Sequence, residues 1–330
     1  ELYRPTLATS PTMTRILIRL ISSLSFVCIG VVLLALAVGH SVTLADNELI
    51  FTAYFATGTN GSLYNIYRMD IAHGLIHPMT TKGNSTAQID VSPNGQQVVF
   101  VRDFGQASAL YIMDLQGKNL RQLTDLSAYA YKPTWSPDGR SIVFINEPTI
   151  GTPDLYIKDL KSDETHRLTD NNRTESAPTW SPDGKHIVFA SDITTPNNMD
   201  IFSLDVATED IQPLIASLVN DTNPIWSPDG RYLMYFTDET KRPALRMMLY
   251  DSLKDKTISL FSDSFFTGDT PDWSPDGRYI VYAAFTSFNS SSLFRLDVGA
   301  CLQQPKTCNA QRLTDAPTFF VSPRWRPNPP

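Results

Sequence analysis

Histidines are the first residues to consider for chemistry, because imidazole groups serve as metal ligands and as general bases near neutral pH. The 330-residue chain holds five of them, which are His40, His73, His77, His166 and His186. They are spread along the sequence, and His73 and His77 flank a predicted turn on the solvated outer side of the fold. A metal centre needs ligands that converge. The sequence therefore predicts no metal site, no cofactor and no catalytic residue.

Repeated carboxylates are the second candidate for chemistry. The phrase Ser-Pro-Asp-Gly occurs four times, and a fifth copy has Asn94 in place of the aspartate; the four aspartates are Asp138, Asp183, Asp229 and Asp276. A calcium loop of the EF-hand type would need the spacing Asp-x-Asp-x-Asp-Gly, which these repeats lack. In a Pro-Asp-Gly turn the carboxylate typically accepts hydrogen bonds from neighbouring backbone amides. We expect these aspartates to stabilise turns and not to bind calcium.

A nucleophilic serine is not indicated either. A peptidase of the α/β-hydrolase type needs Gly-x-Ser-x-Gly at a strand-to-helix turn, and this phrase does not occur in the chain. The formal net charge is −7, and the 27 Lys and Arg residues are scattered along the sequence. A nucleic-acid-binding protein would show them clustered. The sequence predicts neither an enzyme nor a nucleic-acid-binding protein.

The five copies of the turn phrase define the elements that must carry any functional site. Their serines stand at positions 92, 136, 181, 227 and 274, which gives a repeat of 44 to 47 residues. That is the length of one four-stranded propeller blade. A tryptophan precedes four of the five turns, apolar strands follow the turns, and Leu-Thr-Asp ends the last strand in three units. Apolar and polar residues alternate as in half-buried antiparallel strands.

The two ends of the repeat region complete one further unit. Residues 48–91 contain the last three strands of a unit, and Pro323–Pro327 copies the first strand. Pairing of these ends closes the ring and removes the open sheet edges that promote aggregation. We expect an all-β, six-bladed β-propeller of four-stranded antiparallel blades, with N- and C-terminal strands closing one blade and one N-terminal hydrophobic helix before it.

An apolar stretch precedes the propeller. Arg15 and Arg19 come before the uncharged residues 20–38, a length that suits a membrane-spanning helix. Small residues just before Asp46 offer a signal-peptidase site, so a transmembrane anchor and a cleaved signal peptide are both open. Either one places the propeller outside the cytoplasm, in the periplasm or at the cell surface. The expected division of the chain is a non-native or disordered extension at 1–12, the signal peptide or anchor at 13–45 and the propeller at 46–330.

Two of the three cysteines lie close together near the end of the chain. Cys301 and Cys308 stand in one loop of the last unit, whereas Cys28 lies within the apolar stretch. In an exported protein such a pair is expected to form a disulfide. Zinc would need two more ligands, which the neighbouring sequence does not supply.

The two mouths of the predicted ring differ in sequence. In this strand order the Ser-Pro-Asp-Gly turns share one mouth, and the loops that enter each unit share the other. The entering loops vary and combine aromatic with polar residues: Tyr129, Tyr131, Asn171, Arg173, Asn220, Asp221, Phe265, Phe266, Phe319 and Phe320. Aromatic anchors within a polar rim are typical of a protein-binding surface. The other interpretation, that these aromatics pack between blades, stays open.

The repeat as a whole resembles a known family. The combination of Pro-x-Trp-Ser-Pro-Asp-Gly, an Ile-Val-Phe strand, a Tyr-x-x-Asp-Leu strand and Arg-Leu-Thr-Asp is similar to the TolB-like, or WD-like, propeller repeat. The similarity covers residues from about 47 to 330. TolB, a periplasmic component of the Tol-Pal envelope system, carries an α/β domain before its propeller, and here only the export segment and a few residues precede the first strand.

The resemblance implies a fold more directly than a function, because similar repeats occur in several kinds of protein. They include propellers fused to prolyl oligopeptidase-type peptidases and sugar-acting propeller lyases. We expect an extracytoplasmic scaffold for a protein or peptide partner in the cell envelope, held to the membrane by residues 20–38 if these are not cleaved. The alternative is a carbohydrate- or peptide-acting propeller with its site in the central channel.

Overall fold

The computed structural model describes residues 48–54, 64–80, 85–239, 242–263, 270–287, 289–304, 308–315 and 318–327. All of them belong to one compact unit, Asp46–Pro330. The predicted extension at 1–12, the export segment at 13–45 and its hydrophobic helix lie outside the described residues. Within the described ranges, no helix is both long enough and apolar enough to cross a membrane.

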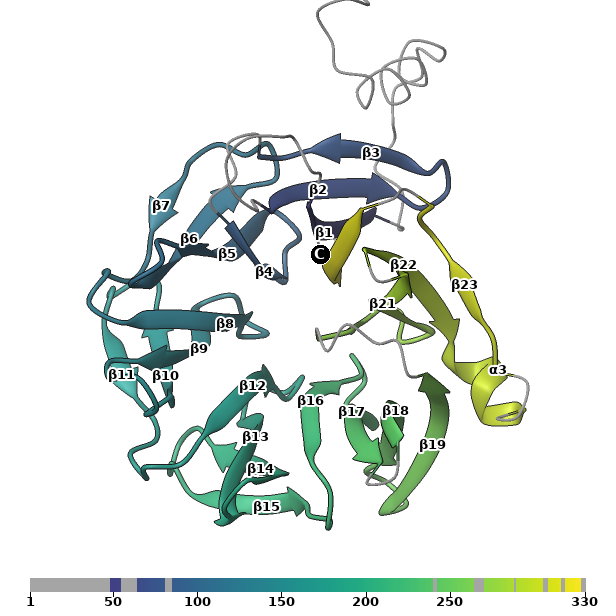
Figure 1. Cartoon of the computed structure of the whole chain (residues 1–330). Coiled ribbons are helices and arrows are strands. Elements are labelled where there is room, and N and C mark those ends of the chain that lie inside the picture. Colours follow the sequence, from purple (N-terminus) through teal and green to yellow (C-terminus); the bar gives the residue numbers. More distant parts are fainter. Residues whose placement is uncertain are drawn as a thin grey trace, which may run out of the picture. The chain divides into compact units, whose positions relative to one another are not determined.

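The described residues form a β-propeller, in which sheets stand side by side around a common centre (Figure 1). The first sheet contains, in spatial order, β24 (Phe319–Trp325), β1 (Glu48–Tyr54), β2 (Asn65–Asp70) and β3 (Leu75–Pro78). The strand from the far end of the chain thus lies antiparallel to the first one, with Leu49 opposite Trp325 and Tyr54 opposite Phe319. The predicted pairing of the two ends is present.

The second sheet is larger than expected. It contains eight strands: β4 (Ser85–Val91), β5 (Gln97–Asp103), β6 (Ser108–Asp114), β7 (Arg121–Gln122), β8 (Tyr129–Trp135), β9 (Ser141–Glu147), β10 (Asp154–Asp159) and β11 (Thr165–Arg167). A single parallel pair, Ser108 with Tyr129, joins β6 to β8. The Ser108 backbone N–H donates to the Ala128 carbonyl, and its hydroxyl donates to the Ala130 carbonyl at 2.9 Å.

Three further sheets of four strands complete the described propeller. The third contains β12 (Glu175–Trp180), β13 (His186–Thr195), β14 (Asn198–Asp205) and β15 (Ile211–Ile215). The fourth contains β16 (Asp221–Trp226), β17 (Tyr232–Glu239), β18 (Arg242–Asp251) and β19 (Lys256–Asp263). The fifth contains β20 (Asp272–Trp273), β21 (Tyr279–Ser287), β22 (Ser290–Asp297) and β23 (Ala310–Arg312).

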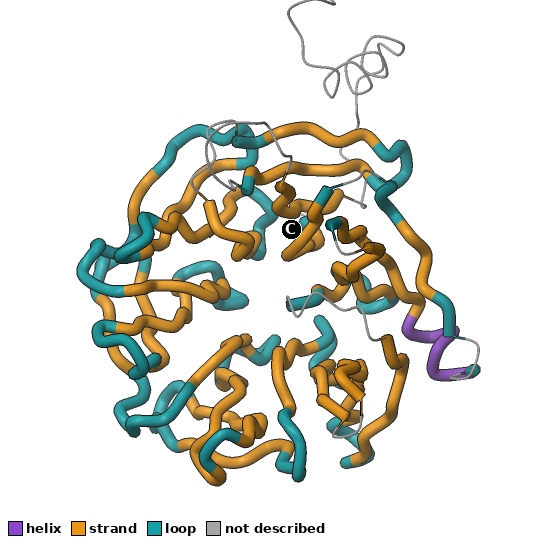
Figure 2. Tube along the Cα trace, in the orientation of Figure 1, coloured by secondary structure: helices purple, strands orange, loops and turns teal. Residues whose placement is uncertain are grey.

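These sheets correct one part of the sequence prediction. Six separate four-stranded sheets were expected, whereas the described chain has four such sheets and one of eight strands. The cause is the Ser108 bridge, which links two repeats that keep four strands each. The all-β class is confirmed: strands account for almost all of the regular structure, and a short helix, α3 (Val298–Gln303), follows β22 (Figure 2).

The repeated turn phrase connects the first two strands of a unit. In the second copy Ser136 donates its hydroxyl hydrogen to the Asp138 carboxylate at 2.7 Å and accepts the Ser141 backbone N–H at 2.9 Å. Asp138 also accepts the Arg140 backbone N–H, and Gly139 adopts a left-handed φ of 69°. The same contacts recur in the other copies with aspartate, so these carboxylates complete the turns as expected.

The core lies between neighbouring sheets. Trp135 of β8 is buried together with Val99 and Leu110 from the preceding repeat. Trp325 of β24 is buried with Val281 and Leu293 of the fifth sheet. Burial of aromatic side chains at each junction removes a large apolar area from water. The tryptophans therefore pack between neighbouring repeats and stabilise the ring.

Candidate functional site

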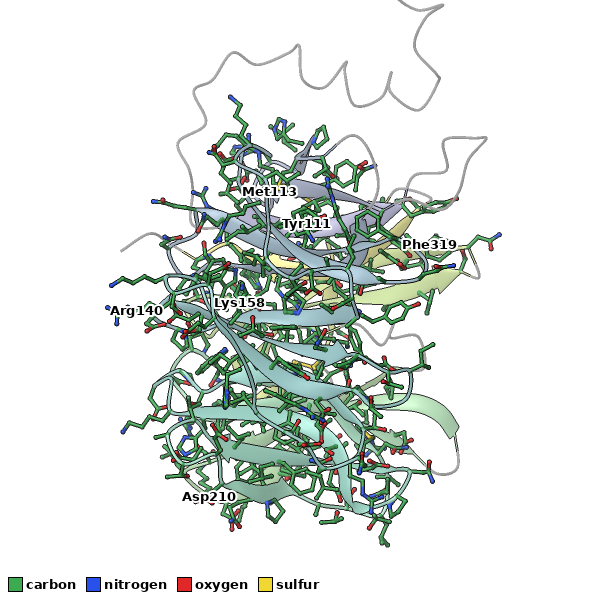
Figure 3. The ribbon with its side chains drawn as sticks, turned by 90° about the vertical axis from the view of Figure 1, so that its left-hand side faces the viewer. Tyr111, Met113, Arg140, Lys158, Asp210 and Phe319 are labelled. Carbon is green, nitrogen blue, oxygen red and sulfur yellow. A yellow bond between two sulfur atoms is a disulfide. The ribbon has the colours of Figure 1, made fainter. Side chains whose placement is uncertain are left out.

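The propeller has two mouths of different construction. We call the end that carries the Ser-Pro-x-Gly turns the turn mouth, and the opposite end, where the chain passes from one repeat to the next, the loop mouth. Figure 3 shows the ring from the side, with Arg140 and Asp210 of the turn mouth at one edge and Phe319 of the loop mouth at the other. The predicted partner-binding residues that the structure describes belong to the loop mouth.

Carboxylates at the turn mouth are engaged locally. The hydrogen bond from the Ser136 hydroxyl holds the pKa of Asp138 below its usual value, and Ser181 does the same for Asp183.

The histidines do not converge: His73 contacts Asp70, whereas His166 contacts Glu209 and lies in another repeat. Among the described residues, no three His, Cys, Asp or Glu side chains gather as a metal centre.

The structure places the predicted rim residues in three groups. Six are half-buried at the loop mouth: Tyr129, Tyr131, Asn171, Arg173, Asn220 and Phe319. Two are buried, since Asp221 is 2% exposed and Phe320 is 0% exposed. Phe265 and Phe266 lie outside the described residues. The buried pair cannot offer side chains to a partner at the surface.

An aromatic cluster lies on the loop mouth where the ring closes. Phe319 contacts Tyr54 and Phe285, with 6.4 Å between ring centroids in each case, and Tyr54 contacts Tyr64 at 6.0 Å. Phe285 is 40% exposed. We call these four residues the aromatic rim cluster. Sequence reasoning found only Phe319, because Phe285 and Tyr54 lie at the ends of other strands and meet it only through the closure of the ring.

Other exposed apolar side chains lie in loops of the same mouth. Ile150 follows β9, and Leu218, which is 99% exposed, precedes β16. Phe104 and Leu126 are also exposed, beside Tyr129, whose hydroxyl donates to the Gly105 carbonyl. The sequence analysis missed all four. Isolated apolar residues within otherwise polar loops were the only signal that could have identified them.

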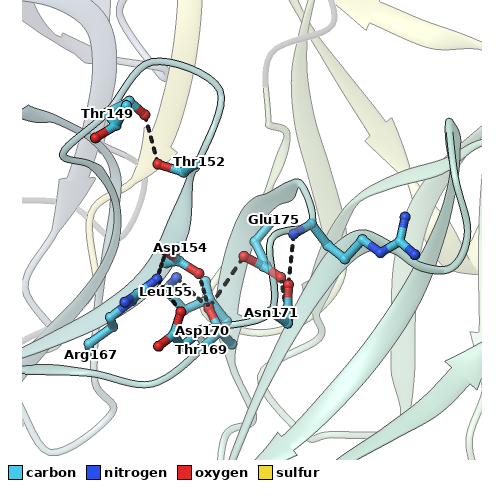
Figure 4. Close-up of polar contacts among 10 residues, drawn as sticks. Thr149, Thr152, Asp154, Leu155, Arg167, Thr169, Asp170, Asn171 and Glu175 are labelled. Carbon is cyan, nitrogen blue, oxygen red and sulfur yellow. Dashed lines mark hydrogen bonds and ion pairs between the residues drawn. The ribbon is translucent and has the colours of Figure 1, made fainter.

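Buried carboxyl groups lie between repeats on this side. At the Arg167 junction, between the β8–β11 strands and the β12–β15 sheet, Arg167 pairs with Asp154 and Asn171 donates to Glu175 at 2.8 Å (Figure 4). The Thr169 hydroxyl lies 3.3 Å from Glu175 and 3.4 Å from Asp154. Burial, together with the charge of Asp154, raises the pKa of Glu175 to about 7.

Carboxylates also lie on the first strands, nearest the centre of the ring. Asp90 accepts the Trp135 backbone N–H at 2.8 Å, and Asp272 accepts that of Trp325 at 2.7 Å. Arg324 lies 3.4 Å from Asp90. Burial raises the pKa of Asp272 to about 7, although the charge of Arg324 opposes this shift. Both carboxylates thus hold neighbouring first strands together.

These features define the class of the protein, which is a β-propeller with two different mouths. The turn mouth repeats the same hydrogen-bonded turn, whereas the loops of the loop mouth vary. The chain matches the family model of the TolB beta propeller domain over residues 90–264, just over half of its length. It belongs to that family, as the resemblance in the sequence implied.

Solved structures agree with this assignment. TolB from Acinetobacter baumannii superimposes with a TM-score of 0.74 at 19% identity, over 86% of this chain and 67% of that one. A candidate TolB from Agrobacterium tumefaciens gives a TM-score of 0.58 at 26% identity, over 70% and 87% of the two chains. The first likeness establishes the fold alone.

A curated relative shares a shorter segment. The "Uncharacterized peptidase YuxL" of Bacillus subtilis (strain 168) is 47% identical over 53 residues. This segment is 16% of the present chain and 8% of the relative. The shared segment is thus about as long as one propeller repeat, and the chain spans only a small part of that protein.

Proposed function

We propose that this propeller is a scaffold that binds a protein or peptide partner of the cell envelope through its loop mouth. The observation that carries the proposal is the aromatic rim cluster, because Phe285 remains exposed beside Phe319 and Tyr54. Exposed apolar residues in four further loops of the same mouth extend this surface. Aromatic and apolar anchors surrounded by polar loops are the usual composition of a protein interface.

The proposed location is outside the cytoplasm. Two features support it: the apolar residues 20–38 after Arg15 and Arg19, and the disulfide between Cys301 and Cys308. Disulfides persist mainly in oxidising compartments. The TolB-like family also suggests the periplasm. Residues 20–38 act either as an anchor or as a cleaved signal peptide in this proposal.

We also propose that the eight-stranded sheet represents two blades, so that the ring has six blades in all. Each half of the eight-stranded sheet carries one copy of the turn phrase and four strands, as the separate sheets do. The halves share a single residue pair. Counting them as two blades gives each repeat one blade and one loop at the rim.

Catalysis in the central channel is the competing hypothesis, and the inner carboxylates bear on it. Asp90 and Asp272 accept backbone hydrogen bonds from neighbouring strands, and Arg324 offsets their charge. Groups engaged in this way are poorly available for proton transfer to a substrate. The sequence contains no Gly-x-Ser-x-Gly phrase, so the 53-residue segment shared with a peptidase-named relative includes no nucleophile elbow. A binding function is therefore favoured.

The experiment compares matched surface variants of the full chain. Phe104→Ser, Phe285→Ser and Leu218→Ser are combined at the loop mouth; Leu120→Ser and Leu253→Ser are combined at the turn mouth, where both leucines are exposed. Because all five side chains are exposed, each change is expected to alter the free energy of unfolding by less than about 0.5 kcal/mol.

Crosslinking in isolated envelopes, followed by mass spectrometry, measures partner capture. We expect at least a tenfold loss for the loop-mouth variant and wild-type capture for the turn-mouth variant. Equal capture by both variants, or no stoichiometric partner for the wild type, would contradict the proposal. In that case a substrate screen of the channel becomes the next experiment.

A further inference from the structure

A cavity of about 520 Å³ lies at the turn mouth between the third and fourth sheets. Two successive copies of the turn phrase line it, one with Asp183 and the next with Asp229, together with the side chains of Trp226 and His186. A volume of this size is typical of sites that take a small ligand or a single side chain. We call this cavity the Trp226 pocket.

The core beneath this junction is small, which leaves part of Trp226 uncovered. Among the described residues, the buried hydrophobic cluster here has four members, whereas the cluster of the preceding junction has nine. Trp180 is a buried member of that larger cluster, but Trp226 only packs against the edge of the smaller one. Of the five tryptophans, Trp226 alone is half-buried. Its ring is therefore available to a ligand in the pocket.

The two carboxylates of the pocket each keep one oxygen atom for a ligand. The Oδ1 atom of Asp183 accepts the Ser181 hydroxyl at 2.6 Å and the Lys185 backbone N–H at 3.1 Å, and Asp229 Oδ1 is engaged in the same way in its own turn. No other described residue donates a hydrogen bond to either Oδ2 atom. A carboxylate oxygen without donors has its full lone-pair capacity left.

The basic groups that flank the pocket do not neutralise these carboxylates by direct pairing. Arg231 pairs with Asp251 at 3.3 Å, and His186 lies 3.8 Å from Asp205. Within the described part of the chain, Lys185 forms no ion pair. The Trp226 pocket thus combines an aromatic ring with two carboxylates that lack a bound cation.

The next repeats show which cation suits such a combination. Arg278 lies over the Tyr279 ring, 4.9 Å from its centroid, and its guanidinium pairs with Asp297 at 3.2 Å. Arg231 makes the same two kinds of contact in the repeat before it. Among the described residues, no arginine or lysine lies over the Trp226 ring. A planar guanidinium can stack on an aromatic face while its edge binds carboxylates.

We propose that the Trp226 pocket binds the guanidinium group of an arginine side chain from a partner protein, with the indole ring as its stacking face and Asp183 and Asp229 as its acceptors. Tryptophan is the best aromatic partner for a cation, and the guanidinium donors match the geometry of carboxylate oxygens. Arginine is also enriched at protein interfaces. This site lies at the turn mouth and does not depend on the partner surface proposed for the loop mouth.

Calorimetric titration of the full chain with N-acetyl-arginine amide, in mild detergent and low-salt buffer, tests the pocket. N-acetyl-citrulline amide, a neutral group of the same shape, should bind about tenfold more weakly or less. Asp183→Asn and Asp229→Asn should each weaken arginine binding about tenfold, through loss of one charge-assisted hydrogen bond. Both variants are expected to fold, because Asn94 already accepts the Ser92 hydroxyl and the Gln96 backbone N–H in the first turn.

Asp138→Asn is the matched control, since it makes the same change in a turn that does not line the pocket. It should bind the arginine probe as the wild type does, whereas Trp226→Phe, which keeps an aromatic ring, should bind about threefold more weakly. The loop-mouth variant that carries Phe285→Ser should also bind normally, so this test and the partner-capture test can fail separately.

The proposal is wrong if the wild type binds no arginine probe, or binds the citrulline probe equally well. It is also wrong if both pocket variants, Asp183→Asn and Asp229→Asn, bind like the wild type. Equal weakening by Asp138→Asn would overturn it as well, because the probe would then be attracted to the negative charge of the whole mouth and not to the pocket.

Discussion

Carboxyl groups at the two mouths of the propeller experience opposite environments. At the turn mouth Asp138 and Asp183 accept hydrogen bonds from a serine hydroxyl and a backbone N–H, and their pKa values are lowered. Towards the loop mouth Glu175 and Asp221 are buried between sheets, and burial raises their pKa values to about 7 and about 6. The side chains of the repeated turn phrase stabilise the turn mouth, whereas the residues of the loop mouth differ from repeat to repeat.

The largest expected effect concerns Gly95, a glycine of the turn mouth at the place where the ring closes. Gly95 has a left-handed φ of 64°, and a Cβ atom there would lie 2.3 Å from the Pro327 carbonyl oxygen. Gly95→Ala therefore forces the closing segment away and also strains the backbone. We expect the free energy of unfolding to fall by about 3 kcal/mol or more, measured by urea denaturation.

The matched control is another glycine of the same turn phrase. Gly139 has a φ of 69°, but a Cβ atom there would meet nothing nearer than Pro93 Cδ at 3.8 Å. Gly139→Ala should lower the free energy of unfolding by only about 1 kcal/mol, the cost of the left-handed backbone alone. Equal losses in the two variants would show that ring closure at Gly95 adds nothing to the turn.

A smaller effect is expected for Glu175, a buried carboxyl group near the loop mouth. Its substitution should raise the free energy of unfolding at alkaline pH, whereas the glycine substitutions lower it. Because the pKa of Glu175 is raised from 4.5 to about 7 in the folded protein, its protonated form stabilises the fold below pH 4.5, and this contribution is lost as pH rises through 7. Glu175→Gln removes the buried charge. We expect the variant to exceed the wild type in stability by about 1 to 2 kcal/mol at pH 8, as measured by urea denaturation.

The pH profile supplies the control for this variant. At pH 5 Glu175 in the folded wild type is largely protonated, so the two proteins should differ by less than about 0.5 kcal/mol. A variant that is equally destabilised at both pH values would indicate that the hydrogen bonds from Asn171 and Thr169, not the buried charge, determine the role of this residue.

The smallest effect concerns one hydroxyl of the turn mouth. Ser136→Ala removes the acceptor of the Ser141 backbone N–H and the donor to Asp138. The expected loss in the free energy of unfolding is about 1 kcal/mol. Ser141→Ala in the same hairpin is the control, because only the backbone of Ser141 takes part in the turn. Similar values for both variants would contradict the assigned role of the repeated serine.

The parts of this molecule that sequence could predict are those set by local spacing. The turn phrase, the tryptophans between sheets and the pairing of the chain ends follow from residue types at fixed intervals. The join between β6 and β8 did not follow, because it depends on one contact of Ser108 across a loop. The spacing of repeats carries no information about such a contact.

Side-chain direction explains the mixed result for the loop mouth. Phe319 and Phe320 are neighbours on β24, and successive residues of a strand point to opposite faces. Phe319 therefore reaches the rim while Phe320 enters the core. Asp221 starts its strand in the inward orientation, so a residue expected at the surface lies between two sheets. The sequence showed which loops vary, but not which residue of each loop faces water.

Closure of the first sheet by β24 also sets an order of events during synthesis. Strand β1 is among the first described strands to be made, and its partner β24 is the last. Until residues 319–325 have been translated, the hydrogen-bonding edge of β1 has no partner from its own chain. A chain that stalls before this point exposes an edge that can pair with a second copy. The edge of β1 is thus protected from such pairing only after β24 has been made and has paired with it.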